Sequence, residues 1–301
     1  MHYTRRNIMN FYNIKGTKKL SVIELIGIAL LAIVFLPITL LLIKPLTILK
    51  NYCRAKNYIA TKLPEDYESK VKLIAHRGFR AVAPENTLPA FEEAGKAGYW
   101  GAENDIHRTR DGVWIVHHDF YSYRMTNKCR PVEKSDYSSL LKLNIDNGSN
   151  YKDYPNLKIP TVEDYLKICA KYNMKAVIEL KGKNNTEHYG EIIDMVKKYG
   201  VDTMFISFQK EAITALRKVT DAPLFYIVNE ITEEAVDFAK SIENCGIDFD
   251  GNDDNNKSKE KVDMILNAGL MPAIWAVDDP ELIKSYADWG ISYITSNSVH
   301  Y

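Results

Sequence analysis

The sequence has few cysteines, and their spacing argues against two common kinds of small domain. The four are Cys53, Cys129, Cys169 and Cys245, and no two of them form a Cys-x-x-Cys pair. Neither a zinc site of that type nor a dense disulfide scaffold is therefore indicated, and we expect unpaired thiols, with a bridge between two of them as the alternative. The 15 glycines and 11 prolines in 301 residues are also too few for a fibrous or disordered chain.

The sequence also lacks a net charge, but its charges are unevenly distributed. Residues 1–63 hold ten of the 39 basic residues and only one of the 39 acidic residues, Glu24. The remainder therefore has 29 basic and 38 acidic residues. Because this acidic part is poorly suited to a polyanion, we expect no nucleic-acid partner, and we expect the basic end to flank a membrane.

The longest uncharged run, residues 25–43, predicts one transmembrane helix. Its 19 residues can cross a hydrocarbon core of about 30 Å at about 1.5 Å per residue. A cleaved signal peptide is disfavoured because the run ends in Leu and Ile followed by Lys44, without the small residues of a cleavage site. We therefore expect a basic tail (1–19), a transmembrane helix (20–44) and an interfacial connector (45–70). Basic residues on both sides leave the membrane orientation open.

From residue 71 onward, short apolar runs alternate with helix-like segments, which is the pattern of repeated βα units. Eight runs are expected to be parallel strands, at residues 73–76, 100–106, 175–180, 203–208, 223–228, 247–252, 272–277 and 292–297. Helices are expected at residues 87–97, 162–172, 188–199, 210–219, 232–244, 257–268 and 280–289. Since eight such strands close a barrel, residues 71–301 are predicted to form an α/β (β/α)8 TIM barrel.

A ninth apolar run, residues 113–118, interrupts this rhythm. Only residues 108–112 separate it from the preceding strand, which permits an antiparallel hairpin but not a parallel crossover. Residues 120–160 are rich in Tyr, Asn and Ser and also lack the barrel pattern. We therefore expect an insertion at about residues 113–160, over the barrel mouth, where the substrate would be selected.

Three carboxylates are predicted to lie together at one end of the barrel. Glu103 and Asp105 alternate along one strand and so share a face, and Glu179 occupies the next barrel strand. Buried carboxylates are costly unless they are paired or bind a metal, so we expect a site for one divalent cation, Ca²⁺ or Mg²⁺, with salt bridges to Arg77 or Lys181 as the alternative. His107 shares the face of the first two carboxylates and could be a fourth ligand, but a lone histidine on a strand is more often a hydrogen-bonded structural group.

Two histidines end strands near these carboxylates. His76 ends the first strand, where a TIM barrel places its active site, and Arg77 beside it offers a forked donor for phosphate oxygens. His118 ends the hairpin strand, whereas its neighbour His117 points to the opposite face. Trp275 is a core residue or an apolar wall for the substrate. Histidines, an arginine and carboxylates together suit metal-assisted chemistry on a phosphate.

These residues resemble the glycerophosphodiester phosphodiesterase family over roughly residues 71–301. The matching pieces occur in the family's order: HRG (76–78), PENT (84–87), AF (90–91), E-x-D (103–105), T-x-D-G (109–112), HD (118–119), PT (160–161), IELK (178–181), SF (207–208) and the tryptophan strand at Trp275. The chain departs from the family at Thr295, Ser296, Asn297 and Ser298, where Thr-Asp usually precedes a proline. That departure leaves the role of the last loop open.

The resemblance implies a TIM-barrel phosphodiesterase with specific roles for these residues. Glu103, Asp105 and Glu179 would bind one divalent metal, and His76 and His118 would form the acid–base pair. Arg77 and Lys181 would contact the phosphate. The substrate's own glycerol hydroxyl would attack phosphorus, and water would then open the resulting cyclic phosphate.

The expected activity is release of glycerol 3-phosphate and an alcohol from a glycerophosphodiester by a membrane-anchored enzyme. Two alternatives are a phospholipase D that acts on lysophospholipids and stops at a cyclic phosphate, and an inactive barrel that binds glycerophospho groups. We expect a single-pass protein of the cell membrane with its catalytic domain outside, although three cysteines in that domain favour the other side. The sequence does not indicate an oligomeric state.

Overall fold

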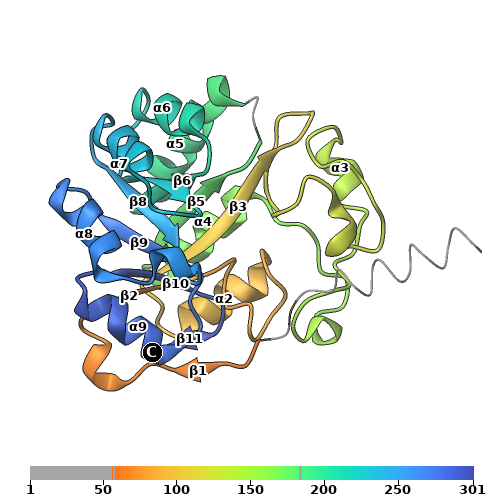
Figure 1. Cartoon of the computed structure of the whole chain (residues 1–301). Coiled ribbons are helices and arrows are strands. Elements are labelled where there is room, and N and C mark those ends of the chain that lie inside the picture. Colours follow the sequence, from red (N-terminus) through yellow and green to blue (C-terminus); the bar gives the residue numbers. More distant parts are fainter. Residues whose placement is uncertain (1–55, 57, 183–184) are drawn as a thin grey trace, which may run out of the picture. The chain divides into compact units, whose positions relative to one another are not determined.

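The computed structural model describes residues 56, 58–182 and 185–301 and shows a closed parallel barrel (Figure 1). Its strands are β2 (Lys72–Ala75), β3 (Gly101–Arg108), β5 (Lys175–Leu180), β6 (Thr203–Ser207), β7 (Leu224–Val228), β8 (Cys245–Asp250), β9 (Pro272–Trp275) and β10 (Tyr293–Ser296). Strand β2 pairs in parallel with both β10 and β3, which closes the ring. The predicted TIM barrel is therefore confirmed.

Helices follow the barrel strands and cover the outside of the barrel (Figure 1). They are α2 (Leu88–Lys96), α4 (Val162–Tyr172), α5 (Tyr189–Tyr199), α6 (Lys210–Arg217), α7 (Glu233–Lys240), α8 (Lys259–Asn267) and α9 (Pro280–Asp288). Several begin at a hydroxyl cap, such as Thr161 accepting from the Asp164 N–H, and α4 ends at Asn173 in the left-handed region (φ 52°). All seven predicted helices are present, with ends shifted by up to four residues.

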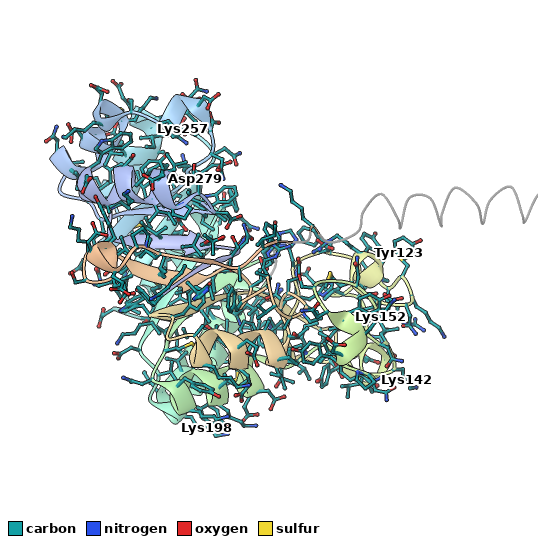
Figure 2. The ribbon with its side chains drawn as sticks, turned by 90° about the horizontal axis from the view of Figure 1, so that it is seen from below. Tyr123, Lys142, Lys152, Lys198, Lys257 and Asp279 are labelled. Carbon is teal, nitrogen blue, oxygen red and sulfur yellow. The ribbon has the colours of Figure 1, made fainter. Side chains whose placement is uncertain are left out.

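Two apolar layers hold the barrel together. The larger lies between the strands and the helices and includes Phe91, Phe205 and Phe249. The smaller fills the barrel interior with Ile74, Val177, Met204, Ile206, Phe225, Ile227 and Ala273. Charged side chains such as Lys198 stand on the outside (Figure 2). The strand alternation seen in the sequence therefore separates an inner from an outer face.

Strand β8 begins two residues before the predicted run 247–252. Cys245 pairs with Leu224, and Gly246 pairs with Phe225. A Cβ atom on Gly246 would lie 2.4 Å from the Met271 carbonyl oxygen, so only glycine fits this part of the strand. The sequence pattern missed this start because glycine is a weak strand former. The shift places Asp248 in the middle of a barrel strand.

The predicted insertion has a small core of its own. Strand β4 (Trp114–Val116) pairs antiparallel with β3, as expected for a hairpin. The following segment contains η2 (Ser122–Arg124), α3 (Tyr137–Leu140) and η3 (Tyr151–Asp153). Val132, Leu140, Leu143 and Ile159 are buried against Ile115. The insertion is thus packed on the hairpin, at the side of the barrel where α3 is labelled in Figure 1.

The packed domain begins before the predicted boundary at residue 71. Strand β1 (Thr61–Lys62) pairs in parallel with β11 (Val299–His300), and η1 (Glu65–Tyr67) follows it. Leu63 is 1% exposed and belongs to the larger core. The described part of the expected connector, 45–70, is therefore part of the barrel domain. Leu63 was assigned to an interfacial connector because basic residues surround it.

The predicted transmembrane helix at residues 20–44 and the basic tail before it lie outside the described residues. Within the described ranges, no helix is both long and apolar enough to cross a bilayer. The same ranges contain Cys129, Cys169 and Cys245, and all three thiols are free. The expected unpaired state is therefore confirmed for these three cysteines.

Candidate active site

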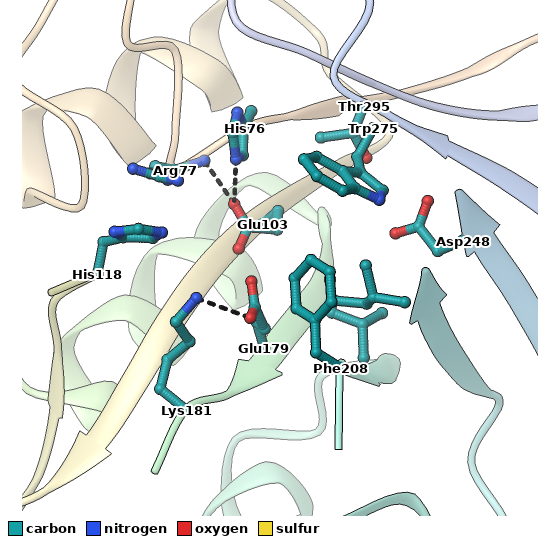
Figure 3. A pocket seen from close by; sticks show the side chains of 12 residues that line it. His76, Arg77, Glu103, His118, Glu179, Lys181, Phe208, Asp248, Trp275 and Thr295 are labelled. Carbon is teal, nitrogen blue, oxygen red and sulfur yellow. Dashed lines mark hydrogen bonds and ion pairs between the residues drawn. The ribbon is translucent and has the colours of Figure 1, made fainter. Parts of the chain in front are cut away.

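A cavity of about 180 Å³ opens among the carboxyl ends of the barrel strands (Figure 3). It brings together seven of the eight residues singled out in the sequence. Its lining consists of His76, Arg77, Glu103, His118, Glu179, Lys181, Ile206, Phe208, Ile227, Asp248, Trp275 and Thr295. The eighth residue, Asp105, is fully buried beside this wall, in contact with Arg77 and Lys181.

The predicted carboxylates form one buried cluster. Ligand oxygens of Glu103, Asp105 and Glu179 all lie within 4.8 Å of one another. Burial, and then the charges of its two carboxylate neighbours, raise the pKa of Glu103 well above its usual range. Burial and the charge of Asp105 raise the pKa of Glu179 to about 7. The surrounding cations therefore do not compensate the ionisation of all three carboxyl groups.

Two unsatisfied oxygens show that this cluster fits a hard cation. Glu103 Oε1 and Asp105 Oδ1 are buried and accept no hydrogen bond from any described residue. Both belong to an all-oxygen donor set of the kind that Ca²⁺ and Mg²⁺ prefer. The salt-bridge alternative accounts for only part of the cluster: Lys181 Nζ lies 3.3 Å from Asp105 Oδ1, but Glu103 Oε1 has neither a hydrogen bond nor an ion pair among the described residues.

The two cations of the site lie on either side of the carboxylates. The Arg77 N–H donates to Glu103 Oε2 at 2.7 Å, and its Nε lies 3.3 Å from Asp105 Oδ2. Lys181 Nζ donates to Glu179 Oε1 at 2.8 Å and lies 3.3 Å from Asp105 Oδ1. Burial opposes ionisation of Asp105, but the charges of His118, Arg77 and Lys181 hold its pKa well below the usual range.

The turn after β2 explains why this end of the sequence reads His-Arg-Gly. Arg77 adopts φ 59° and Gly78 adopts φ 75°, so both lie in the left-handed region. A Cβ atom on Gly78 would lie 2.7 Å from Ala90, which requires glycine where the turn meets α2. The unusual conformation of Arg77 directs its backbone N–H at Glu103.

His76 is held by the last loop of the chain. Its Nδ1 lies 2.7 Å from Asn297 Oδ1, and Asn297 is itself fixed by Asp278, which accepts from its backbone N and from Nδ2. A carbonyl oxygen at this position requires the proton to be on Nδ1, so Nε2 is free to accept a proton. Burial, and then the charges of Arg77 and Arg80, keep the pKa of His76 well below its usual range. Residues 295–298, where the sequence departs from the family's usual pattern, therefore contact the site through Asn297.

His118 enters the cavity from the insertion. Its Nδ1 donates to Asp119 Oδ1 at 2.7 Å. Asp119 also accepts from Arg124 Nε at 2.7 Å, and these contacts hold its pKa well below the usual range although burial opposes them. The His118 side chain borders the same half of the cavity as Arg77 and His76, across from Asp248 (Figure 3). The hairpin therefore supplies the second histidine, as predicted.

Glu85 is a central residue of the site that the sequence analysis quoted only within the PENT match. It is 3% exposed and accepts from Arg77 Nη1 at 2.9 Å and from Arg124 Nη2 at 2.6 Å. Arg80 pairs with its other oxygen. Its neighbour Asn86 donates to Asp105 Oδ2 at 2.7 Å. The motif itself was the only signal, because it shows no strand or helix periodicity.

His107 is not part of the carboxylate cluster and is instead a hydrogen-bonded structural histidine, which was the favoured of its two interpretations. Its Nδ1 lies 2.9 Å from Glu133 Oε1, and its Nε2 lies 3.4 Å from the His118 carbonyl oxygen. Both ring nitrogens thus have protein partners, which explains why sharing a strand face did not bring it to the site. His117 is buried, and its Nε2 lies 3.5 Å from the Tyr121 carbonyl oxygen, on the face predicted for it.

The end of the cavity away from His118 contains a residue that the sequence analysis missed. Asp248 is 3% exposed, and burial and the charge of Glu179 raise its pKa well above the usual range. Trp275 borders the same space and meets the Phe208 ring edge-on, with 5.6 Å between centroids. Alternation of Asp248 and Asp250 in an apolar strand repeats the Glu103/Asp105 pattern and could have revealed it.

Comparison with known proteins agrees with this geometry. The sequence model of the "Glycerophosphoryl diester phosphodiesterase family" matches residues 76–300. Glycerophosphodiester phosphodiesterase 1 of Bos taurus is 32% identical over 157 residues, which cover 50% of this chain and 46% of that protein. The glycerophosphodiester phosphodiesterase of Bacillus subtilis is 25% identical over 253 residues, which cover 76% of this chain and 84% of that protein.

Solved structures give the same result for the fold. The phosphodiesterase OLEI02445 of Oleispira antarctica, solved in complex with its product sn-glycerol-3-phosphate, has a TM-score of 0.69 and 24% identity, covering 79% of this chain and 96% of that one. The chain spans about half the length of the mammalian relatives that it matches. Because the family match extends over most of the chain, this protein belongs to the glycerophosphoryl diester phosphodiesterase family.

Proposed function

We propose that this protein hydrolyses glycerophosphodiesters to glycerol 3-phosphate and an alcohol by acid–base catalysis between His76 and His118. The observation that carries the proposal is that both histidines border one cavity whose wall contains the carboxylate cluster. Membership of the family supports it. A similar fold in a phosphodiesterase that was solved with sn-glycerol-3-phosphate is a further argument for that product.

Glu103, Asp105 and Glu179 would hold one Ca²⁺ or Mg²⁺ ion. When bound, such a cation neutralises charge on the phosphate. Arg77 and Lys181 border the same cavity and would bind phosphate oxygens, each exchanging part of its contact with the carboxylates for the substrate. Trp275 would form an apolar wall for the substrate's carbon atoms.

The two histidines would divide the proton transfers according to their surroundings. His76 is neutral with Nε2 unprotonated, so it accepts the proton of the attacking glycerol hydroxyl as the oxygen bonds to phosphorus. The bond to the departing alcohol breaks, and His118 gives that oxygen a proton. Water then opens the cyclic phosphate, with the two histidines in reversed roles.

The test is hydrolysis of glycerophosphocholine and glycerophosphoethanolamine by the full chain, with Ca²⁺ or Mg²⁺ and with EDTA. We expect cation-dependent release of glycerol 3-phosphate that His76→Ala and His118→Ala each reduce by at least about a hundredfold. His188→Ala is the matched control, because this imidazole pairs with Glu191 on the surface. Equal activity of the two site variants and the control would refute the assignment.

Product analysis separates this proposal from the phospholipase D alternative. Lysophospholipid should be a poor substrate, and glycerol 3-phosphate rather than a cyclic lipid phosphate should accumulate. A folded protein that binds the cation and the diester but releases no product would instead support the inactive glycerophospho-binding barrel.

We also propose that residues 20–44 anchor the enzyme in the cell membrane with the barrel outside. The uncharged run 25–43 and the basic residues around it support the anchor. The outer side is proposed because an enzyme that scavenges headgroups or processes the envelope would find its substrate there. The barrel should stay with membranes after carbonate extraction and be cleaved by protease added to sealed cells. Protection from that protease would place the barrel on the inner side.

A further inference from the structure

The cavity has two halves of different chemistry (Figure 3). One half carries the histidines, Arg77, Lys181 and the carboxylate cluster, and it suits a phosphate. The other half is walled by Trp275, Phe208, Ile206 and Ile227, with Asp248 among them. The proposed reaction uses the second half only through the apolar ring of Trp275, so the polar groups of this half have no assigned purpose.

Burial of Asp248 at this position destabilises the fold unless a ligand supplies a hydrogen bond to its carboxyl group. Its Oδ1 is buried and receives no hydrogen bond from the part of the chain that the structure describes. A buried carboxyl oxygen without a donor is unfavourable, and a purely packing role would be better filled by an apolar residue. The side chain lies on the inner face of β8 and borders the cavity.

Trp275 presents the complementary polar atom. Its indole Nε1 is also buried and has no acceptor among the described residues. It lies on β9, the strand next to β8 in the barrel, and borders the same cavity. The second half of the cavity therefore offers one free acceptor and one free donor between apolar walls.

This pair of orphaned atoms is suited to a hydroxyl group. An alcohol oxygen can accept from Trp275 Nε1 while its O–H donates to Asp248 Oδ1. An ammonium group has no lone pair for the indole, and an anion would meet the Asp248 carboxyl group.

We propose that Asp248 and Trp275 form a hydroxyl-binding subsite for the glycerol unit of the substrate, with Asp248 as the residue that determines specificity. This inference rests on the proposed function. Glycerol is the part that every substrate of the proposed class shares, whereas the alcohol that leaves varies. Phe208 and Ile227 would pack against its carbon atoms, while the phosphate occupies the half beside the histidines.

The first test compares binding of sn-glycerol 3-phosphate with binding of propane-1,2-diol 1-phosphate, which lacks the terminal hydroxyl. The full chain should bind glycerol 3-phosphate about tenfold more tightly or better, because the analogue leaves both protein groups unpaired. Asp248→Ala and Trp275→Phe should bind the two ligands equally. Asp237→Ala, which removes an exposed carboxylate from α7, should discriminate as the wild type does.

A second comparison asks which part of the substrate the subsite recognises. The ratio of kcat/KM for glycerophosphoethanolamine to that for glycerophosphoethanol depends only on the leaving group. Asp248→Leu, a substitution of similar size that removes the acceptor oxygen, should leave this ratio unchanged while reducing discrimination between the two phosphate monoesters. A changed ratio would assign the subsite to the leaving alcohol and overturn the inference.

The outcomes distinguish this inference from the proposed function. If the wild type hydrolyses glycerophosphodiesters but Asp248→Ala keeps full discrimination, only the subsite is wrong. If the wild type neither hydrolyses these diesters nor binds glycerol 3-phosphate, the proposed function and the subsite both fail. Circular dichroism and cation binding by each variant verify that the barrel and the carboxylate cluster are intact.

Discussion

Replacing Glu179 by glutamine should stabilise the metal-free protein at neutral pH. Glu179 is 8% exposed and adjoins two other carboxylates, and its pKa rises from 4.5 to about 7. A carboxyl group with a raised folded pKa makes the native state lose stability as pH rises from the unfolded pKa to the folded one. The difference of about 2.5 corresponds to about 3 kcal/mol, and the whole cost is present above pH 7.

The assay is urea denaturation of wild type and Glu179→Gln with EDTA, between pH 4.5 and 8. The difference in free energy of unfolding should be small at the acid end and grow to about 3 kcal/mol in favour of the variant. Because other buried groups such as His76 are common to both proteins, their titration largely cancels. Glu187→Gln, at an exposed position in the same βα loop, should show no such growth.

Addition of Ca²⁺ or Mg²⁺ should make the wild type more stable than Glu179→Gln. A cation that binds only the native state stabilises it, and the variant has lost one ligand. A difference that stays flat from pH 4.5 to 8 would refute the reasoning. It would mean that the ion pair with Lys181, at 2.8 Å, governs Glu179 rather than repulsion within the cluster. A difference of the opposite sign would lead to the same conclusion.

Two further predictions concern residues around the site. Asn297→Ala removes the acceptor for His76 Nδ1, so kcat should fall about tenfold or more with little change in KM in steady-state assays, and an unchanged kcat would contradict this role. Glu85→Ala leaves three arginines without a shared partner, so urea denaturation should show a loss of about 3–5 kcal/mol. Glu93→Ala, which breaks only a surface pair with Lys96, should cost less than about 1 kcal/mol.

Local patterns in the sequence were sufficient for the barrel and for the first set of site residues. Alternation along a strand placed Glu103 and Asp105 on one face, because side chains repeat every two residues in any extended strand. The short gap before residue 113 required a hairpin for purely steric reasons. Helix 162–172 has the ends that were predicted, and the structure shows Thr161 capping its start and Asn173 ending it in the left-handed region.

Local patterns did not predict the positions of residues whose environment depends on contacts with segments that are distant in the sequence. Leu63 looked like part of a membrane-proximal connector, yet it is buried because β1 pairs with β11 at the other end of the domain. The start of β8 was missed at Gly246, because glycine has a low strand propensity. Glycine is required there by the close approach of the Met271 carbonyl oxygen. His107 shares the strand face of the carboxylates, but its Nδ1 lies 2.9 Å from Oε1 of Glu133 in the insertion.

The sequence by itself determined the fold class and singled out the histidines and carboxylates that the structure brings to one end of the barrel, because strand period and hairpin length are short-range properties. Only the tertiary structure decided which partners hold those residues. His76 meets Asn297 across 221 positions of sequence, and Glu85 joins arginines from two segments. Asp248 borders the cavity, and its Oδ1 has no hydrogen-bond partner among the described residues, because the barrel closes around it. Closure and register are set by packing of the whole chain, and no local pattern encodes them.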